Sequence, residues 1–387
     1  RPSPGTSSCS AQKKTQAREE GGKMKNKVQI YVMTHKPFTG PDDPIYVPVH
    51  VGRRAWLTAH PGEESELLAY VGDDSGDNIS DQNCYYSELT GMYWVWKNSD
   101  ADYIGICHYR RYLLDHDSAL FDQQKIRQVL KTYDIITTKN LQLNFPYQEG
   151  FVHHHKKVYL DTTEEVLREL YPEYGNTFEK LAAEKHTYFG NMLITRKEIY
   201  DAYMAWLFDI LFNVQSRVKV EEEDSYHRRI FGFLSEFLQY VWIVQNHLNV
   251  HECMVGMFGE KAEVTETKRK LAEFFKARDY EGAMQYFLAA RKARPDLLME
   301  ASDITGELHL CMEIIAIAGL EQEKYGTNLL DRCNDFAKLM HYGNELNRYA
   351  LSLIRGEEDD VLKQWVRENQ VSDVALESAI AVMRATE

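Results

Sequence analysis

Positive charge is in deficit in this sequence of 387 residues, because 45 lysines and arginines face 59 aspartates and glutamates and the formal net charge is −14. General binding to a nucleic-acid backbone needs a concentrated basic surface, so no nucleic-acid partner is expected. Long apolar runs are missing too: no stretch reaches the roughly 20 residues that a membrane-spanning helix requires. We therefore expect a protein that is soluble or bound at a membrane surface.

Cysteine and glycine patterns exclude several further classes. The six cysteines are scattered, and no pair has the short spacing of a zinc ribbon or a redox motif. We expect reduced thiols and a cytoplasmic location. Neither a glycine-rich P-loop nor a dinucleotide fingerprint is present, so a phosphate-bearing ligand would have to be bound by side chains.

The beginning of the chain differs in composition from the rest. Residues 1–26 are polar and rich in serine, glycine and lysine, which predicts a disordered or non-native leader. The stretch EEGGKM can be encoded by a purine-rich ribosome-binding site just before a start codon. Met24 is therefore our hypothesis for the biological start.

From Lys27 onwards, short β-branched and aromatic runs alternate with helical spacing. This alternation favours an α/β domain over residues 27–257, with a Rossmann-type, mostly parallel sheet flanked by helices. The strand pattern then stops, and residues 258–387 predict an all-α C-terminal domain for oligomerisation or partner contact. The expected strands are 28–33, 103–107, 134–138 and 188–195, and a capping-box pattern at Thr162 and Glu165 predicts a helix start.

The stretch DADYIGICHYRRYLL, residues 100–114, combines an apolar run with an abrupt polar end. Ligands of open α/β sheets lie at the carboxyl ends of strands, where His108, Arg110 and Arg111 follow the run. Arginine matches phosphate oxygens bidentately, and histidine can donate to the same anion or shuttle a proton. The pattern indicates a phosphate-bearing ligand; solvated charges capping a strand are the alternative.

Three other features are less specific. The loop VGDDSGDNIS, residues 71–80, is typical of a solvated loop with Asx-turns, or of one that holds ribose or sugar hydroxyls. The triplet His153 to His155, if extended, could offer at most two side chains to one metal ion, so acceptor or phosphate contact ranks above metal binding and ordinary loop histidines above both. Glu236 points away from the apolar face of its predicted helix, toward a cleft or toward solvent.

Several of these stretches together resemble a known family. IYVMTHKPF, VPVHVG, GDDSGDNIS, YYSELTGMYWVWKN, DYIGICHYRRYL and FGFLSEFLQYVW are similar to motifs of bacterial capsular-polysaccharide glycosyltransferases long catalogued as a domain of unknown function. The hallmark of that family is His-Tyr-Arg-Arg-Tyr, and the resemblance spans residues 28–250. It implies a GT-A-like nucleotide-sugar transferase, with the donor at the strand ends and an acceptor groove alongside.

The resemblance also implies a role for the HYR stretch. Many GT-A enzymes carry Asp-x-Asp at this place, where it holds a divalent metal on the donor diphosphate. Fixed cations can stabilise the same developing charge. We expect no cofactor and metal-independent transfer, with manganese or magnesium left open and Asp73 or Asp77 as the first candidates for ligands.

Residue roles follow from the resemblance together with the chemistry of the side chains, with core packing, capping or solvent exposure as the alternative. The expected catalytic residues are His108, Arg110 and Arg111 on the leaving diphosphate and Glu236 as the base, with His154, Asp224 and Glu88 as rival bases. The expected donor-binding residues are Thr34, His35, Asp73, Asp77, Asn78, Tyr86, Glu88, Asn191 and Met192. The expected acceptor-binding residues are His153, His154 and His155.

The expected reaction is transfer of a hexose from a UDP-linked donor, of which UDP-galactofuranose is one candidate, to a capsular or O-antigen-type glycan. A lipid-linked acceptor would bring the enzyme to the inner face of the membrane as a peripheral protein. Two alternatives stay open. A non-catalytic carbohydrate-binding protein would stack sugars on aromatic side chains such as Trp94 and Trp96, and a helical-repeat scaffold would act through residues 258–387.

Overall fold

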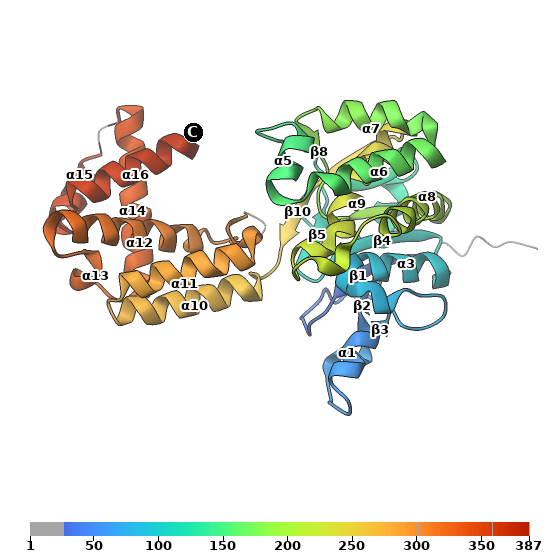
Figure 1. The fold of residues 1–387 in the computed structure, drawn as a ribbon, viewed down its shortest axis with the longest axis horizontal. Helices are drawn as coiled ribbons and strands as arrows, with labels where there is room; N and C mark the ends of the chain where they lie inside the picture. The colour runs from blue at the N-terminus through green and yellow to red at the C-terminus, as the bar shows by residue number, and fades with distance from the viewer. Residues whose placement is uncertain (1–26, 300–301, 358, 387) are drawn as a thin grey trace, which may run out of the picture. The chain divides into compact units, whose positions relative to one another are not determined.

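The computed structural model describes residues 27–299, 302–357 and 359–386 of the chain. They form two compact units, whose boundary falls between Gly256 and Met257. Unit 1 is mixed α/β, and the elements described after Met257 are helices (Figure 1). The expected leader, with Met24, lies outside the described residues.

An eight-stranded mixed sheet forms the centre of unit 1. Four strands run parallel in the order β3-β2-β1-β4. β9 pairs antiparallel with both β4 and β6, β10 runs parallel to β6, and β5 links β10 to the end of β4, so this half of the sheet closes on itself. The strands are β1 (Val28–Thr34), β2 (Tyr46–His50), β3 (Val71–Gly72), β4 (Tyr103–His108), β5 (Arg111–Leu114), β6 (Ile135–Thr138), β9 (Leu193–Arg196) and β10 (Val250–Met257). A separate ribbon pairs β7 (Leu141–Gln142) with β8 (His186–Thr187).

The structure has the α/β class expected from the sequence. The expected Rossmann-type, mostly parallel sheet is not confirmed, because the sheet is mixed. The stretch expected to be one strand over residues 188–195 is broken by Gly190 and Asn191, whose φ angles are 97° and 49°. A left-handed backbone cannot continue a strand. The chain therefore re-enters the sheet only at Leu193, antiparallel to both of its neighbours.

Strand β4 is covered on both faces. Ile104 and Ile106 belong to one hydrophobic cluster and Cys107 to another, and all three are at most 2% exposed. A strand that is covered on both faces has apolar residues at successive positions rather than at alternate ones. This explains the uninterrupted apolar run before His108. A Cβ at Gly105 would lie 2.8 Å from Ile30 Cγ1, so only glycine allows this close approach of β1.

Helices cover the sheet of unit 1 (Figure 1). Side chains from α3, α8 and α9 share one core with the sheet, including Leu89, Tyr203 and Phe237. Helix α6 begins at Lys157 rather than at the capping-box pattern, because Thr162 and Thr163 lie buried inside it. The helices are α1 (Arg53–Ala59), α2 (Asn83–Tyr86), α3 (Leu89–Asn98), α4 (Gln123–Val129), α5 (Tyr147–His154), α6 (Lys157–Leu170), α7 (Gly175–Ala182), α8 (Lys197–Gln215) and α9 (Ile230–Gln245).

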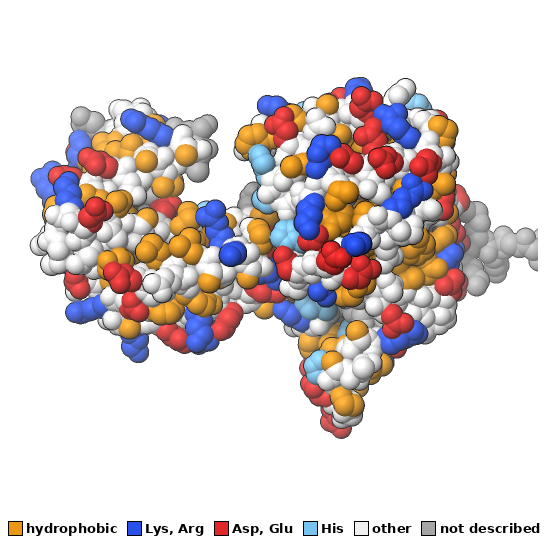
Figure 2. All heavy atoms as spheres, viewed as in Figure 1, with side chains coloured by type: hydrophobic (Ala, Val, Ile, Leu, Met, Phe, Trp, Pro, Cys, Tyr) orange, Lys and Arg blue, Asp and Glu red, His pale blue; other side chains and the backbone are white. Residues whose placement is uncertain are grey.

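Unit 2 has a hydrophobic core of its own, which includes Phe275, Phe287, Ile314 and Leu339. Its helices are α10 (Ala262–Lys276), α11 (Tyr280–Ala293), α12 (Glu307–Tyr325), α13 (Leu329–Arg332), α14 (Phe336–Arg355), α15 (Asp360–Glu368) and α16 (Asp373–Thr386). Among the described residues, no helix has the length and apolar character needed to cross a bilayer. Acidic and basic side chains are interspersed over the face seen in Figure 2.

Candidate functional site

The carboxyl ends of four parallel strands lie in one row. Met33 of β1 pairs with His108 of β4, and Thr34 pairs with His50 of β2. His50 in turn pairs with Gly72 of β3. The polar residues that follow these strands, including the expected Thr34, His35 and Asp73, therefore share one edge of the sheet with the HYRRY stretch, as expected for a ligand-binding edge.

His108 is buried and holds a peptide of the chain. Its Nε2 lies 2.5 Å from the carbonyl oxygen of Gly190, which can only accept, so Nε2 carries the proton. Burial, together with the positive charge of Arg111, lowers the pKa of His108 to about 4, against the opposing effect of Glu88. The imidazole is neutral near pH 7, which leaves Arg110 and Arg111 as the cations of this stretch.

The turn at Gly190 and Asn191 is held from several sides. The Asn191 amide donates to Glu88 Oε1 at 2.7 Å and to the carbonyl of Gly232 at 3.1 Å, and its oxygen accepts from Ser235 Oγ at 2.8 Å. Asparagine tolerates the left-handed region better than most residues. The side chain expected to bind the donor is thus engaged inside the protein, where it fixes the turn.

Glu236 binds the other backbone group of Gly190, the N–H of the preceding peptide. Its Oε1 accepts a hydrogen bond of 2.8 Å from Gly190 N, so of the two expected surroundings, cleft or solvent, the carboxyl group meets the protein's own backbone. Burial and the negative charge of Glu88 raise the pKa of Glu236 to about 8, and Arg111 opposes this increase. A Cβ at Gly190 would lie 3.4 Å from Arg111 Nη1, which places that guanidinium beside the turn. We call Glu88, His108, Arg111 and Glu236, around Gly190, the carboxyl–imidazole cluster.

The rival bases have other environments. His154 is exposed. Asp224 accepts hydrogen bonds from the backbone and ring of His227, and these bonds, the backbone one foremost, lower the pKa of Asp224 to about 2. A carboxylate with so low a pKa is a weak base.

Asp73 is an anchor inside the protein. The buried carboxylate accepts hydrogen bonds from Gly52 N, Arg53 N, Ser80 Oγ and Thr90 Oγ1, at 2.7, 3.1, 2.6 and 2.6 Å. Its oxygens are therefore occupied by protein donors, and Asp73 holds the loop against α1 and α3.

The rest of this loop follows the Asx-turn alternative. Asn78 donates to the Gly76 carbonyl and accepts from Ser80 N, at 2.9 and 3.2 Å. Asp77 is exposed and accepts from Tyr93 OH at 3.1 Å. These contacts stabilise the loop locally.

Two expected donor contacts lie in the core. Tyr86 is fully buried, stacks on Phe231 and donates to Gln215 Oε1 at 2.9 Å. Met192 is 1% exposed and packs under the sheet. Neither side chain is exposed to a ligand in solution.

The two expected donor-binding residues at the end of β1 differ in their surroundings: Thr34 is buried and His35 is exposed. Thr34 Oγ1 donates to the Lys36 carbonyl at 2.6 Å and accepts from Lys36 N at 3.1 Å, which fixes the turn after β1. His35 is exposed and packs edge-on against Tyr109, with 5.6 Å between the ring centroids. Arg110 lies with its guanidinium carbon 5.5 Å from the same Tyr109 ring.

The three consecutive histidines close helix α5 instead of forming an extended segment. His153 and His154 are exposed in its last turn, and the C-cap residue His155 is buried. Successive helical side chains diverge by about 100°, so the extended-chain reasoning does not apply to them.

The aromatic residues proposed for a carbohydrate-binding protein are largely covered. The Trp96 ring stacks with Phe208 at 6.1 Å between centroids, and the ammonium nitrogen of Lys97 lies 3.3 Å from the Trp96 centroid. Trp94 donates to Ser75 Oγ at 3.0 Å. These contacts do not favour an open stacking surface.

One group of possible metal ligands occurs among the described residues: Asp115, His116 and Asp117, which follow β5. It contains neither Asp73 nor Asp77, and Lys125 already pairs with Asp115.

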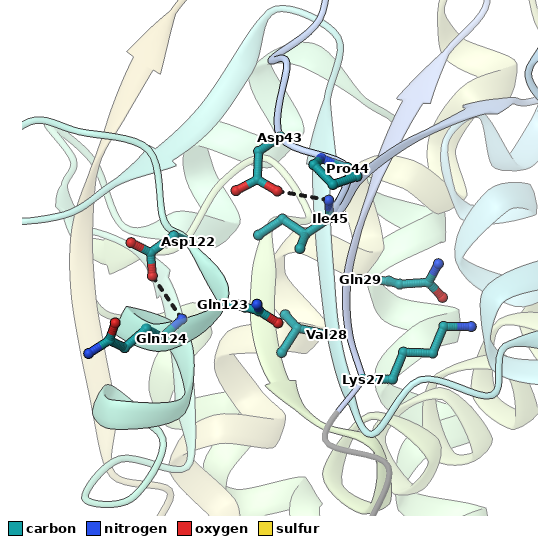
Figure 3. A pocket seen from close by; sticks show the side chains of 9 residues that line it. All are labelled: Lys27, Val28, Gln29, Asp43, Pro44, Ile45, Asp122, Gln123 and Gln124. Carbon is teal, nitrogen blue, oxygen red and sulfur yellow. Dashed lines mark hydrogen bonds between the residues drawn. The ribbon is translucent and has the colours of Figure 1, made fainter.

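A pocket of about 510 Å³ lies at the opposite, amino end of β1 (Figure 3). Its carboxylates are engaged by the protein's own backbone: Asp43 accepts from Ile45 N at 3.0 Å, and Asp122 caps α4 through Gln124 N at 2.8 Å. None of the expected site residues lines it.

Sequence reasoning missed Gly190 and Ser235, which hold the site together. The Gly-Asn dipeptide inside an apparent strand was an available signal, because such pairs mark turns.

Comparison with known proteins supports a glycosyltransferase-like fold. A solved structure described as "WbbM bifunctional glycosytransferase apo structure" matches with a TM-score of 0.53 and 27% sequence identity. The match covers 60% of this chain and 46% of that one, so the chain spans less than half of that protein. No curated protein matches. The family model "Domain of unknown function (DUF4422)" matches residues 29–247, and the chain therefore belongs to that family.

Proposed function

We propose that unit 1 is a glycosyltransferase that moves a sugar from a nucleoside-diphosphate donor to a glycan acceptor. One observation carries the proposal: β4 brings Arg110 and Arg111 to the sheet edge, where Arg111 lies beside the turn that the half-buried carboxyl group of Glu236 holds, in a fold similar to that of a glycosyltransferase.

The two arginines would bind the donor diphosphate. A departing nucleoside diphosphate develops negative charge, and preorganised guanidinium groups can stabilise it without a metal ion. Arg110 is 9% exposed and lies against Tyr109, so little freedom is left for it to lose on binding. Metal-independent transfer is part of the proposal.

Glu236 would take the proton from the acceptor hydroxyl. A general base works best when its pKa lies near the working pH, and the pKa of Glu236, raised to about 8, meets this condition. Neutral His108 would position the base, because it holds the carbonyl of Gly190 while Glu236 holds the amide of the same residue.

The finer assignments extend the same proposal. The donor would be a UDP-hexose, with UDP-galactofuranose as the first to test, and the acceptor a capsular or O-antigen-type glycan. A lipid-linked acceptor would place the enzyme at the inner face of the membrane. His35, exposed beside Tyr109, would contact the nucleotide.

The test is nucleoside-diphosphate release from a panel of nucleotide sugars, measured with glycan acceptors. We expect turnover with one donor class and a loss of at least a hundredfold in Arg110→Ala, the effect of removing one preorganised donor to developing charge. Arg348→Ala, which removes an exposed arginine paired with Glu345 in unit 2, is the matched control and should keep wild-type activity. Turnover that survives Arg110→Ala would contradict the proposed role of Arg110, and no turnover with any donor would contradict the function.

A further inference from the structure

Four aromatic rings and one guanidinium group gather where α5 ends and α9 begins. We call His155, Tyr226, His227, Arg229 and Phe233 the Arg229 cluster. The guanidinium carbon lies 5.1 Å from the Tyr226 centroid and 5.9 Å from that of Phe233. The His155 ring lies 4.5 Å from Phe233 and stacks on Tyr226 at 6.0 Å, and His227 packs edge-on against both His155 and Tyr226.

The Arg229 guanidinium contacts aromatic rings but no acidic side chain of the described residues. Among the described residues, no carboxylate pairs with its guanidinium group and no oxygen accepts from it, although the side chain is half-buried. The neighbouring acids have other partners: Asp224 binds His227, and Glu223 binds Lys156 and Tyr159. The half-buried guanidinium, held by the rings and without a carboxylate partner, has donors available for the oxygens of an anionic ligand.

His155 is a second unsatisfied group in the same place. The side chain is nine-tenths buried, and its Nδ1 has no hydrogen-bond partner among the described residues. Burial, followed by the positive charge that His227 would carry, lowers the pKa of His155 to about 3. The ring is therefore neutral and does not repel the neighbouring guanidinium.

The Arg229 cluster adjoins the carboxyl–imidazole cluster through the first turn of α9. Residues three apart on a helix are neighbours, and Gly232 follows Arg229 by three. The Gly232 carbonyl accepts from Asn191, and a Cβ at Gly232 would lie 3.9 Å from Glu88 Oε1. The turn that carries the unpaired cation thus also contacts residues around Glu236.

We propose that the Arg229 cluster is an acceptor subsite that binds an anionic group of the acceptor, a phosphate or a carboxylate, through the Arg229 guanidinium. This inference rests on the proposed function. The donor diphosphate already has Arg110 and Arg111 at the end of β4, so a separate cation at the start of α9, the helix that carries Glu236, serves the other substrate. Tyr226 and Phe233 hold the guanidinium plane, which reduces the freedom lost when two parallel hydrogen bonds form.

The experiment compares wild type and Arg229→Gln in initial-rate kinetics with the full chain. Three matched acceptor glycans are used: a neutral one, one with a terminal phosphate and one with a uronic acid. We expect wild type to favour one or both anionic acceptors, and Arg229→Gln to raise the KM for them at least about tenfold, as the loss of a charge-assisted hydrogen bond allows. The donor KM should stay within about twofold, and the phosphate and uronate arms identify the source of the anion.

Arg217→Gln is the control, because the Arg217 guanidinium is already paired with Glu169 through two hydrogen bonds. Equal acceptor KM values in wild type and Arg229→Gln would overturn the subsite, and so would a rise in donor KM alone or no preference of wild type for an anionic acceptor. If wild type turned over no donor, the proposed function would fail by itself. The subsite would then be decided by calorimetric binding of the anionic glycans, which Arg229→Gln should abolish and which equal binding would contradict.

Discussion

The charge of Glu88 should set the pH at which the enzyme works. Glu88 and Glu236 both bind the Gly190–Asn191 turn, and the charge of Glu88 is the second cause, after burial, of the raised pKa of Glu236. Glu88→Gln removes this charge but keeps an oxygen that can accept from the Asn191 amide. The turn should therefore persist while the pKa of Glu236 falls.

The sign and size follow from the pKa of about 8 for Glu236, compared with 4.5 for an ordinary glutamate. A base must be deprotonated to act, so kcat/KM of wild type should rise with pH and level off above about 8. At pH 7 only about one-tenth of Glu236 is ionised, and each tenfold change in its ionisation constant corresponds to about 1.4 kcal/mol. Glu88→Gln should move the midpoint to lower pH and raise the fraction of active base at pH 7.

The assay is diphosphate release at low donor concentration from pH 5.5 to 9.5, with rates normalised to each variant's own plateau. Arg111→Gln provides the opposing case: Arg111 lowers the pKa of Glu236, so its removal should move the midpoint to higher pH. A Glu88→Gln midpoint that stays in place or moves upward would refute the reasoning. A Glu236→Gln enzyme that kept the wild-type profile would remove Glu236 as the base.

Two further predictions concern the loop anchor and the metal. Asp73→Asn should lower the free energy of unfolding, measured by urea unfolding, by about 2–4 kcal/mol. In the wild type four donors share the two carboxylate oxygens of Asp73, whereas an amide offers them only one accepting oxygen. Asp81→Asn, which breaks an exposed pair with Arg54, should change it by less than about 1 kcal/mol; equal effects of the two changes would show that Asp73 is no anchor. Exhaustive treatment with EDTA should leave turnover unchanged; activity lost and then restored by manganese would contradict metal-independent transfer.

The local sequence pattern was enough to predict where some strands near the site lie, but not the direction in which they pair. Burial on both faces gives β4 a continuous apolar run, so both the strand and the charged residues after it could be recognised. The positions of β1 and β6 could be predicted for the same reason. The direction in which strands pair cannot be predicted from such runs, because a buried antiparallel strand such as β9 has the same apolar composition as a buried parallel one.

By itself, the sequence determined that strands and helices alternate, that a buried strand ends in two arginines, and that the helical pattern of the last third differs from what precedes it. Only the tertiary structure decided what those residues meet. Glu236 and Gly190 are 46 residues apart, and Glu88 and Asn191 are 103 apart. The protonation of Glu236 depends on desolvation and on neighbours brought together across such separations, and the unpaired state of Arg229 depends on where the surrounding acids find other partners. Such quantities belong to the packed chain, because no local pattern of residues encodes the distance between two charges.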